Sequence, residues 1–411
     1  MATKIWRGDQ AAVSQVNTIT PANVNIGNTF TVTINLKEIT FTATAATVAN
    51  VTAGLVALLT ASTVPPEFAE VTFTDSTTTI TATAVTPGQP FTQTSSATGG
   101  TATLVTATTV ANSSPNDWND ADNWDPVNVP VNGDDVFIEN TAVSILYGFA
   151  QSAVTLTSLN IAASFTGAIG LPVHTGLYYE YRATYLAIGA TTINVGSGPG
   201  NGSGRLKINT GSVQTTINVF ATAAGLESGL EAFLWKGTHA SNTVEITRGS
   251  MGVAVFGGET ATIATIRCGY QQSLASDVSM RCGTGTTLTT IEKSGGDLTI
   301  QSNSVTINHV DGTLAILAGT VTTLNVDGGT VYYQSTGTVT TLNVGDDATV
   351  DYSRDMSART VTACNLYSRG SIQDPYKSVV WTAGIDLERT NLNDVDLDLG
   401  TNIKITPAAV T

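Results

Sequence analysis

The 411-residue chain has little charge and few aromatic, histidine or cysteine residues. Only 12% of it is charged, and 32 acidic residues outnumber 17 basic ones, which leaves a net charge of −15. This balance argues against a nucleic-acid or anionic-membrane partner, because both kinds of partner recruit Lys and Arg. A coiled coil or long-helix protein is also excluded, because such proteins are rich in Ala, Glu, Lys and Leu.

Cysteine is scarce as well. Cys268, Cys282 and Cys364 form no C-x-x-C pair, so we expect reduced thiols in a protein assembled in a cytoplasm, with a Cys268–Cys282 disulfide as the alternative. The N-terminus, MATKIWRGDQ, has no apolar stretch of the signal-peptide type. The most apolar stretch, Val48 to Leu59, is too short to span a bilayer. Low-charge, Thr-rich surfaces are nevertheless typical of extracellular proteins, so we expect a protein that is made inside a cell and later leaves it.

Threonine is abundant, at 71 residues. Together with Val, Ile and short Gly-punctuated runs, it favours strands. The 41% of hydrophobic residues is enough to bury a core, which argues against wholesale disorder. The sequence therefore predicts a mainly β protein of roughly two domains, one of them elongated.

Residues 1–111 are predicted to form a small N-terminal α+β domain. The alternating runs FTVTIN (30–35) and ITFTAT (39–44) predict a hairpin, and Val71–Thr74 with Thr79–Ala84 predicts a second strand pair. A helix between them would begin at a Thr47 N-cap and end before Pro65 and Pro66. Its apolar face would consist of Val48, Val51, Leu55, Leu58 and Leu59.

The segment 112–135 is rich in Asn, Asp, Pro and Trp. We interpret it as a linker into a second domain, residues 136–411. Trp118 and Trp124 are expected to pack on the first turn of that domain.

Residues 136–411 consist of short apolar runs separated by Gly, Asn, Asp and Ser. The run GTVTTLNV occurs at 319–326 and at 337–344, 18 residues apart, and looser copies begin at 288, 305 and 361. A recurrence of this size predicts a β-solenoid, here a right-handed parallel β-helix. Its inside would carry Val321, Leu324 and Val326, and its outside Thr and Asn. The alternative, a β-sandwich of ordinary hairpins, needs no fixed period.

The region before residue 285 is less regular. The run TTINV occurs at 191–195 and again at 215–219. The intervening GSGPGNGSG (196–204) lacks the Lys of a phosphate-binding loop, so it is interpreted as an exposed, flexible loop.

The sequence shows no catalytic constellation. The pairs Asp134–Asp135 and Asp346–Asp347 lie in turn sequences, which favours turn chemistry over a glycosidase pair. Asp394, Asp396 and Asp398 lack the Gly-containing loop of calcium motifs. We therefore predict no enzyme, no cofactor and no metal site.

The remaining candidates for chemistry favour structural interpretations. No histidine has a metal-ligand partner at suitable spacing, so His174, His239 and His309 are expected at a surface or interface. Tyr178, Tyr179, Tyr181 and Tyr185 could form a saccharide platform, as could Tyr332 with Tyr333, but packing at an edge or interface is favoured. Arg7-Gly8-Asp9 matches an integrin-ligand tripeptide by chance, whereas Ile5 to Arg7 could anchor the chain to a neighbouring subunit.

Two stretches resemble known proteins. ANVNIGNTFTVTINLKEITFTATAATVANVTAGLVALL (22–59) resembles a small module of structural proteins of tailed bacteriophages and prophages. NW (123–124), with VPVNGDDVFIEN (129–140) and the Thr- and Gly-rich coils that follow, resembles the start of β-solenoids in phage and bacterial surface proteins. The resemblance rests on composition and pattern and covers most of the chain. It implies a virion structural protein, often trimeric, and it assigns no catalytic role to any residue of this sequence.

Three functions compete. We favour a capsid decoration or cement protein that is assembled in the host cytoplasm as a homotrimer and binds the outer surface of a phage head, with the major capsid protein or other virion proteins as partners. A tail spike or fibre that binds host polysaccharide is the second hypothesis, and a bacterial adhesin is the third. The predicted interface residues are Trp6, Phe30, Phe41, Trp118 and Trp124.

Overall fold

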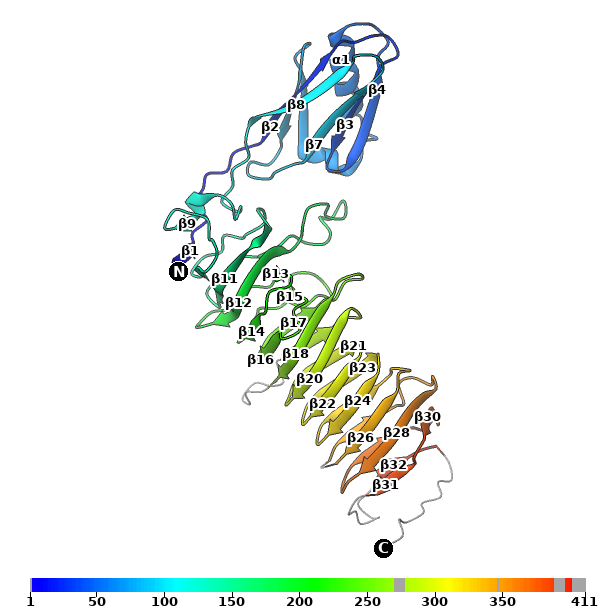
Figure 1. Cartoon of the computed structure of the whole chain (residues 1–411). Coiled ribbons are helices and arrows are strands. Elements are labelled where there is room, and N and C mark those ends of the chain that lie inside the picture. The colour runs from blue at the N-terminus through cyan, green and yellow to red at the C-terminus, as the bar shows by residue number, and fades with distance from the viewer. Residues whose placement is uncertain (1, 270–277, 346, 388–395, 401–411) are drawn as a thin grey trace.

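The computed structural model describes residues 2–269, 278–345, 347–387 and 396–400, and these residues are mainly β. Figure 1 shows an N-terminal unit at one end of a long stack of strands. Each part has its own hydrophobic core. Ile19, Phe30 and Leu55 belong to the core of the N-terminal unit, whereas Val136 and Leu324 belong to the core of the stack.

The N-terminal unit, residues 16–110, contains two antiparallel sheets and one helix. One sheet has the order β5 (Val71–Asp75), β6 (Ile80–Ala84), β2 (Val16–Ala22) and β8 (Thr103–Val110). The other has the order β4 (Lys37–Thr42), β3 (Thr29–Ile34) and β7 (Gln93–Thr98). The 3-10 helix η1 (Pro66–Glu70) leads into β5.

β3 and β4 form a hairpin in the predicted region. Its turn consists of Asn35 and Leu36, which both have positive φ (50° and 69°). Two-residue turns with positive φ match the right-handed twist of the flanking strands. The turn therefore begins one residue earlier than the gap between the two predicted runs, residues 36–38, and is one residue shorter.

The helix α1 covers Val48–Leu59, and the Thr47 side chain accepts a hydrogen bond from a backbone N–H of its first turn. This cap and these bounds agree with the prediction. Val51, Leu55 and Leu59 are buried, as expected from their spacing. Leu58 is 39% exposed, so its place on the predicted apolar face was wrong.

The stack consists of parallel strands arranged in two columns. The first column contains β10 (Asp135–Ile138), β11 (Ala150–Ala162), β12 (Leu186–Ser197), β14 (Thr216–Val219), β16 (Thr243–Ile246), β18 (Ala261–Cys268), β20 (Thr286–Lys293), β22 (Ser304–His309), β24 (Val321–Val326), β26 (Val339–Val344), β28 (Arg359–Leu366), β30 (Val379–Trp381) and β31 (Ile385–Leu387). The second contains β13 (Leu206–Asn209), β15 (Phe233–Lys236), β17 (Gly249–Val253), β19 (Val278–Cys282), β21 (Asp297–Gln301), β23 (Thr313–Ala318), β25 (Thr330–Tyr333), β27 (Thr349–Asp351), β29 (Ser371–Gln373) and β32 (Asp396–Asp398).

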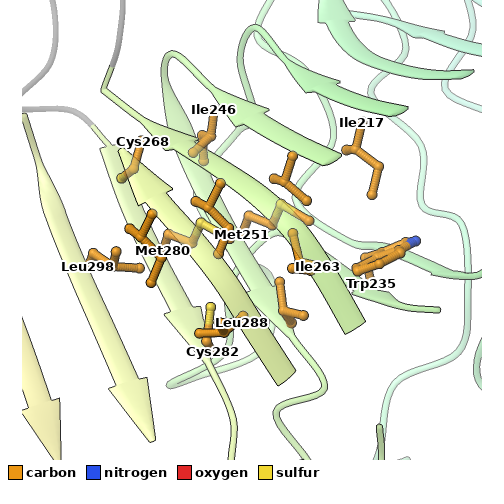
Figure 2. Close-up of a cluster of buried hydrophobic side chains, with 14 of the residues drawn as sticks. Ile217, Trp235, Ile246, Met251, Ile263, Cys268, Met280, Cys282, Leu288 and Leu298 are labelled. Atoms are coloured by element: carbon orange, nitrogen blue, oxygen red, sulfur yellow. The ribbon is translucent and has the colours of Figure 1, made fainter. Parts of the chain in front are cut away.

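The register within the first column confirms the predicted β-solenoid. Val321 pairs with Val339 and Leu324 pairs with Leu342, in parallel, so the 18-residue repeat is one turn of the solenoid. These residues are buried, and Figure 2 shows comparable side chains filling the interior from β14 to β21. A β-sandwich of hairpins is excluded for this part, because hairpins would produce antiparallel neighbours.

One rung departs from the predicted register. The looser copy that begins at Val305 was aligned so that Val305 matches Val321, the first valine of the full run. In the structure Ser304, and not Val305, pairs with Val321. Ser304 is therefore buried and Val305 is 48% exposed. A slip of one residue exchanges the inner and outer faces of a strand, and here the buried residue is polar while the outward one is apolar, which misleads a pattern-based alignment.

Two rows of polar side chains follow the outside of the first column. Thr192 and Thr216 begin an uninterrupted row of Thr that ends at Thr341. Asn308, Asn325 and Asn343 lie two positions further along their strands. Asn325 donates through its amide nitrogen to the Asn308 oxygen, and Asn343 donates in the same way to the Asn325 oxygen. The outward Thr and Asn that the composition predicted thus form ladders along the axis.

Two polar residues of successive rungs, Lys293 and His309, occupy a core position that is apolar in the following rungs. Lys293 pairs with His309, which pairs with Val326. The Lys293 ammonium donates to the carbonyl oxygens of Gly295, Gly296 and Asp311 at 2.6–2.9 Å. His309 is fully buried and neither ring nitrogen has a hydrogen-bond partner among the described residues. Its predicted place at a surface or interface was therefore wrong, because it lies in the core of the solenoid.

The first residues of the chain lie in the solenoid and not in the N-terminal unit. β1 (Thr3–Trp6) pairs in parallel with β10 and antiparallel with β9 (Trp124–Asp125), which follows the 3-10 helix η2 (Ala121–Asn123). The boundary at residue 111 and the linker at 112–135 are thus corrected. Residues 3–6 and the segment around β9 together close the first rung, and the N-terminal unit is inserted between them.

The glycine-rich segment 196–204 is also better packed than predicted. Gly200 has a φ of +142°, and a Cβ there would lie 2.1 Å from the Ala163 carbonyl oxygen. Ser203 is buried and donates to the Gly167 carbonyl oxygen. The glycines permit close backbone approach, so the segment is not simply an exposed loop.

Candidate functional site

Three tryptophans pack together where the solenoid begins. The rings of Trp6 and Trp124 are 5.0 Å apart and those of Trp118 and Trp124 are 4.6 Å apart, both edge to face. The indole N–H of Trp6 donates to the Val143 carbonyl at 3.0 Å. All three rings are buried. This tryptophan cluster covers the apolar end of the first rung, which would otherwise be open to solvent.

Two chain segments leave this cluster side by side and enter the N-terminal unit. Val13 and Ser113 form an antiparallel bridge, and the Val13 N–H donates to the Ser113 carbonyl at 2.9 Å. The Ser113 hydroxyl donates to the Ala11 carbonyl at 2.9 Å. The unit is therefore attached by two paired segments, and not by one linker.

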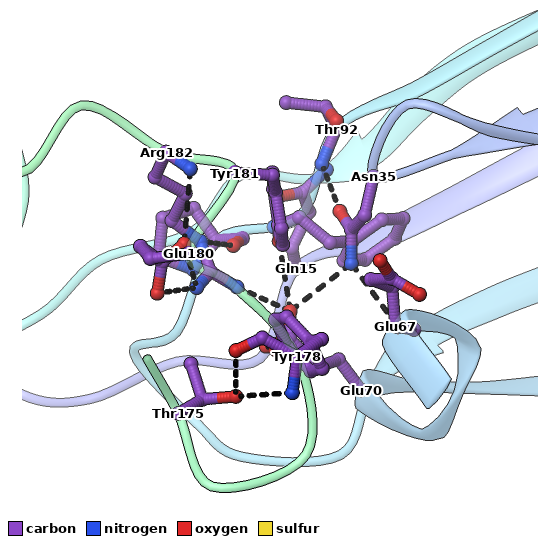
Figure 3. A network of polar contacts seen from close by, with 12 residues as sticks. Gln15, Asn35, Glu67, Glu70, Thr92, Thr175, Tyr178, Glu180, Tyr181 and Arg182 are labelled. Carbon is purple, nitrogen blue, oxygen red and sulfur yellow. Dashed lines mark hydrogen bonds and ion pairs between the residues drawn. The ribbon is translucent and has the colours of Figure 1, made fainter. Parts of the chain in front are cut away.

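A second attachment lies at Glu70, at the end of η1. Its carboxylate accepts hydrogen bonds from Tyr181 at 2.8 Å, from Tyr178 and from the Arg182 guanidinium. On its own side, Asn35 of the β3–β4 turn donates to the same carboxylate at 3.1 Å. Figure 3 shows these side chains converging on Glu70 from a solenoid loop and from the unit. We call this set the Glu70 junction.

Burial and charge at the Glu70 junction keep its side chains in the protonation states that these hydrogen bonds require. Burial raises the pKa of Tyr181, and Glu70 adds to this rise against the opposing charge of Arg182. Burial and the hydrogen bond to Glu70 raise the pKa of Tyr178. Burial lowers the pKa of Arg182, but Tyr181, Glu70 and Glu180 outweigh it and the net pKa is raised. Both phenols therefore stay donors, and the guanidinium stays charged.

The loop that carries Tyr178 and Arg182 is held at its base by a buried ion pair. The Lys207 ammonium lies 2.7 Å from the Glu227 carboxylate and donates to the Leu171 carbonyl at 2.8 Å. Glu227 also accepts from the Val173 N–H at 2.9 Å. Burial lowers the pKa of Lys207, and the bond to Glu227 partly offsets this. These contacts position the loop against the N-terminal unit.

A hollow of about 570 Å³ lies beside the same loop. Its floor is a row of outward side chains from successive rungs, Ala187, Asn209 and Lys236, which pair in register. Its walls include Tyr179, Tyr185, Phe256 and Glu259. Lys236 lies 2.9 Å from Glu259 and 4.2 Å from the centre of the Tyr185 ring. Aromatic faces and a fixed ion pair thus meet in one concave site.

The five predicted interface residues do not form a surface. Trp6, Trp118, Trp124 and Phe30 are at most 1% exposed. A side chain with no exposed surface cannot contact a partner while the fold persists, so these four serve the two cores. Phe41 is only partly buried and packs against the N-terminal core.

The other sequence candidates have structural surroundings. Asp134 accepts from the backbone N–H groups of Ala2 and Val131, which agrees with turn chemistry. The three cysteines are free and buried, so no Cys268–Cys282 disulfide is present. Asp346 and Asp394, of the other two acidic motifs, lie outside the described residues. His174 and Tyr179 pack edge to face in the loop beside the hollow.

The charged residues of the Glu70 junction and of the hollow were missed by sequence reasoning. Glu70, Arg182, Lys236 and Glu259 lie in separate loops or strand ends, and none belongs to a spaced motif. The only available signal was the run of tyrosines at 178–185, for which interface packing was favoured. Tyr178 and Tyr181 do pack at the Glu70 junction, whereas Tyr179 and Tyr185 line the hollow.

Within the described ranges, no group of three or more His, Cys, Asp or Glu side chains is arranged to hold a metal ion. None of the helices described has the length and apolar character needed to cross a membrane. Comparison with protein families, with curated proteins and with solved structures gives no match for this chain.

Proposed function

We propose that the chain is a structural protein of a tailed-phage virion that decorates the outer surface of the head. The observation that carries this proposal is the double attachment of the N-terminal unit, through the paired segments at Val13 and Ser113 and through the Glu70 junction. A force on the unit is passed to the solenoid through both attachments. Such a module suits a protein that bridges neighbouring capsid subunits with a stiff element.

In this proposal the N-terminal unit docks on the major capsid protein, and the solenoid is the bridging or projecting part. The docking surface must use residues other than the buried tryptophans and Phe30. Ile26 and Leu36 are candidates, because about 70% of each side chain's surface is exposed (71% and 70%). Right-handed winding and assembly as a homotrimer belong to the same proposal. The resemblance to phage structural proteins and the acidic, low-charge composition support it.

The number of copies per particle tests this assignment. Quantitative mass spectrometry of purified particles should find the chain at hundreds of copies if it decorates the head. A few dozen copies or fewer would instead favour the second candidate, a tail spike or fibre. Absence of the chain from particles would refute both.

A variant without the N-terminal unit tests which part docks. Residues 14–112 can be replaced by a short Gly-Ser turn, because Val13 and Ser113 already lie side by side. This variant should keep the cooperative unfolding of the solenoid, whose core is separate, and should no longer bind stripped particles. Undiminished binding would assign docking to the solenoid.

A further inference from the structure

We propose that the hollow beside the Glu70 junction binds a neutral saccharide ring. This inference goes beyond head decoration and does not depend on it. The hollow has the volume of a small-molecule site and combines aromatic walls with a few fixed polar groups. Its ligand class follows from three features: the polar groups, the aromatic faces and the balance of charge.

The polar groups are held in place before any ligand arrives. The Glu259 carboxylate lies 2.9 Å from the Lys236 ammonium, and it accepts from the Tyr185 hydroxyl at 3.4 Å and from the Phe256 N–H at 3.3 Å. Lys236 has three donor hydrogens and uses one on Glu259. The Asn209 amide oxygen accepts from the Gly211 N–H at 3.0 Å, and its amide N–H groups remain available as donors to a ligand. Donors and acceptors in fixed positions suit vicinal hydroxyl groups.

Two of the three aromatic residues of the hollow, Tyr179 and Phe256, offer exposed surface to an apolar face of a ligand. Lys236 covers the Tyr185 ring, so that ring supports the ion pair. Tyr179 is 76% exposed, and Phe256 is partly exposed. A sugar ring presents C–H groups on its faces and hydroxyls at its rim, which matches aromatic walls over a polar floor.

The charges of the hollow argue for a neutral ligand. Lys236 pairs with Glu259 at 2.9 Å, and Arg182 pairs with Glu180 at 3.1 Å. The side chains of these ion pairs are at most 26% exposed. A charged ligand would have to compete with a partner that is already in place, and separating a buried pair is costly. A neutral polyol can bond to both members of a pair without separating them.

The test uses the intact chain and saturation-transfer NMR with the methyl glycosides of glucose, galactose, mannose and N-acetylglucosamine. At least one should receive saturation, with a dissociation constant measurable by titration. Tyr179→Ala and Phe256→Ala should each weaken this binding at least 10-fold. Tyr367→Ala removes a comparably placed surface aromatic, 42% exposed and far along the solenoid, and should not change it. Unchanged thermal unfolding of all three variants shows that the fold is kept.

Three results would overturn the proposal: no transfer to any of the four glycosides, unchanged affinity in both hollow variants, or at least 10-fold tighter binding of glucuronate or glucosamine. A free sugar and a ring within a glycan chain share this chemistry. If a hexasaccharide binds at least as tightly as its monosaccharide, the ligand of the hollow is a ring within a glycan chain. Exclusion of the hexasaccharide assigns it to free sugar, and either outcome supports a neutral-ring site.

Discussion

The Tyr181 hydroxyl donates to the Glu70 carboxylate at 2.8 Å, although 111 positions separate the two residues in the chain. The bond joins the N-terminal unit to a loop of the solenoid. Because the Glu70 carboxylate also accepts hydrogen bonds from Tyr178, Arg182 and Asn35, four donors converge on it. The attachment at this junction therefore depends strongly on the Glu70 side chain.

Replacing Glu70 by Gln should loosen the unit. The amide keeps one acceptor oxygen but loses the charge, and hydrogen bonds to charged groups contribute about 1.5–3 kcal/mol each. A loss of that size shifts the equilibrium toward the detached unit by roughly 10- to 100-fold. Spin labels at Ser76→Cys and Ser241→Cys can report this, because the native cysteines are buried. Electron spin resonance should show a second, longer distance.

Glu38→Gln provides the matched control, because Glu38 is exposed on β4 of the same unit. It should leave the distance distribution as in the parent chain. A single, unchanged distance in the Glu70 variant would mean that the paired segments at Val13 and Ser113 hold the unit without help.

The protein should lose stability in mild acid through His309. Burial, together with the nearby positive charge of Lys293, lowers the pKa of His309 to about 3. Its pKa in the unfolded chain is near 6.5, so the unfolded state binds the proton first as the pH falls. Stability is unaffected above pH 6.5, falls by about 1.4 kcal/mol per pH unit below it, and levels off near pH 3.

His309→Val removes this acid sensitivity, because Val326 occupies the same position in the next rung. Urea unfolding at pH 7 and pH 4.5 should show the parent losing about 2.7 kcal/mol more than the variant. Loss of carboxylate interactions in acid affects both chains and cancels in the difference. His239→Gln, at a partly exposed histidine, is the control. Equal acid sensitivity of the parent and His309→Val would contradict the buried, neutral histidine.

Trp6→Ala should destabilise the fold. The ring is 1% exposed and packs edge to face on Trp124 at 5.0 Å. Truncating a buried Trp costs about 3–5 kcal/mol, and here it also uncovers the end of the solenoid. Urea unfolding monitored by fluorescence measures the change. Trp381→Ala, at a partly buried Trp, should cost less. Near-parental stability combined with lost particle binding would restore the interface role predicted for Trp6.

The regular part of the fold was predictable because its pattern is local. Val321, Leu324 and Val326 alternate with Thr and Asn, and the same run returns 18 residues later, so one rung is recognised from the next. Val305 shows the limit of this reasoning. Where a rung has Ser on its inner face and Val on its outer face, the hydrophobic pattern predicts the wrong register, and only the neighbouring strands determine it.

The closed end and the Glu70 junction could not be predicted for a different reason. Trp6 meets Trp124, and Glu70 meets Arg182, across more than a hundred positions. Such contacts depend on how the chain returns after the inserted unit, and they leave no period in the sequence. The tyrosines at 178–185 indicated packing, but nothing near them identified Glu70 as the partner.

The Asn ladder on the outside of the solenoid should contribute measurably to stability. Asn325 donates to the Asn308 oxygen at 2.8 Å, and its own oxygen accepts from Asn343 at 2.6 Å. Asn325→Ala removes both bonds, and at about 0.5–1.5 kcal/mol each the expected loss is about 1–3 kcal/mol. Thr322→Ala, at an exposed position of the same strand, should change stability by less than about 0.5 kcal/mol.

The same ladder predicts a specific coupling between rungs. In Asn325→Ala, the Asn343 amide has already lost its acceptor, so adding Asn343→Ala should cost less than it does in the parent chain. A double-mutant cycle by urea unfolding should give an interaction energy of about 0.5–1.5 kcal/mol. Asn325→Asp keeps the acceptor for Asn343 but places a carboxylate against the Asn308 oxygen, where no donor remains. It should therefore be less stable than the parent above about pH 4, where the carboxyl is ionised. Strictly additive losses in the cycle would mean that solvent satisfies the amides and that stacking of the backbone alone holds the rungs together.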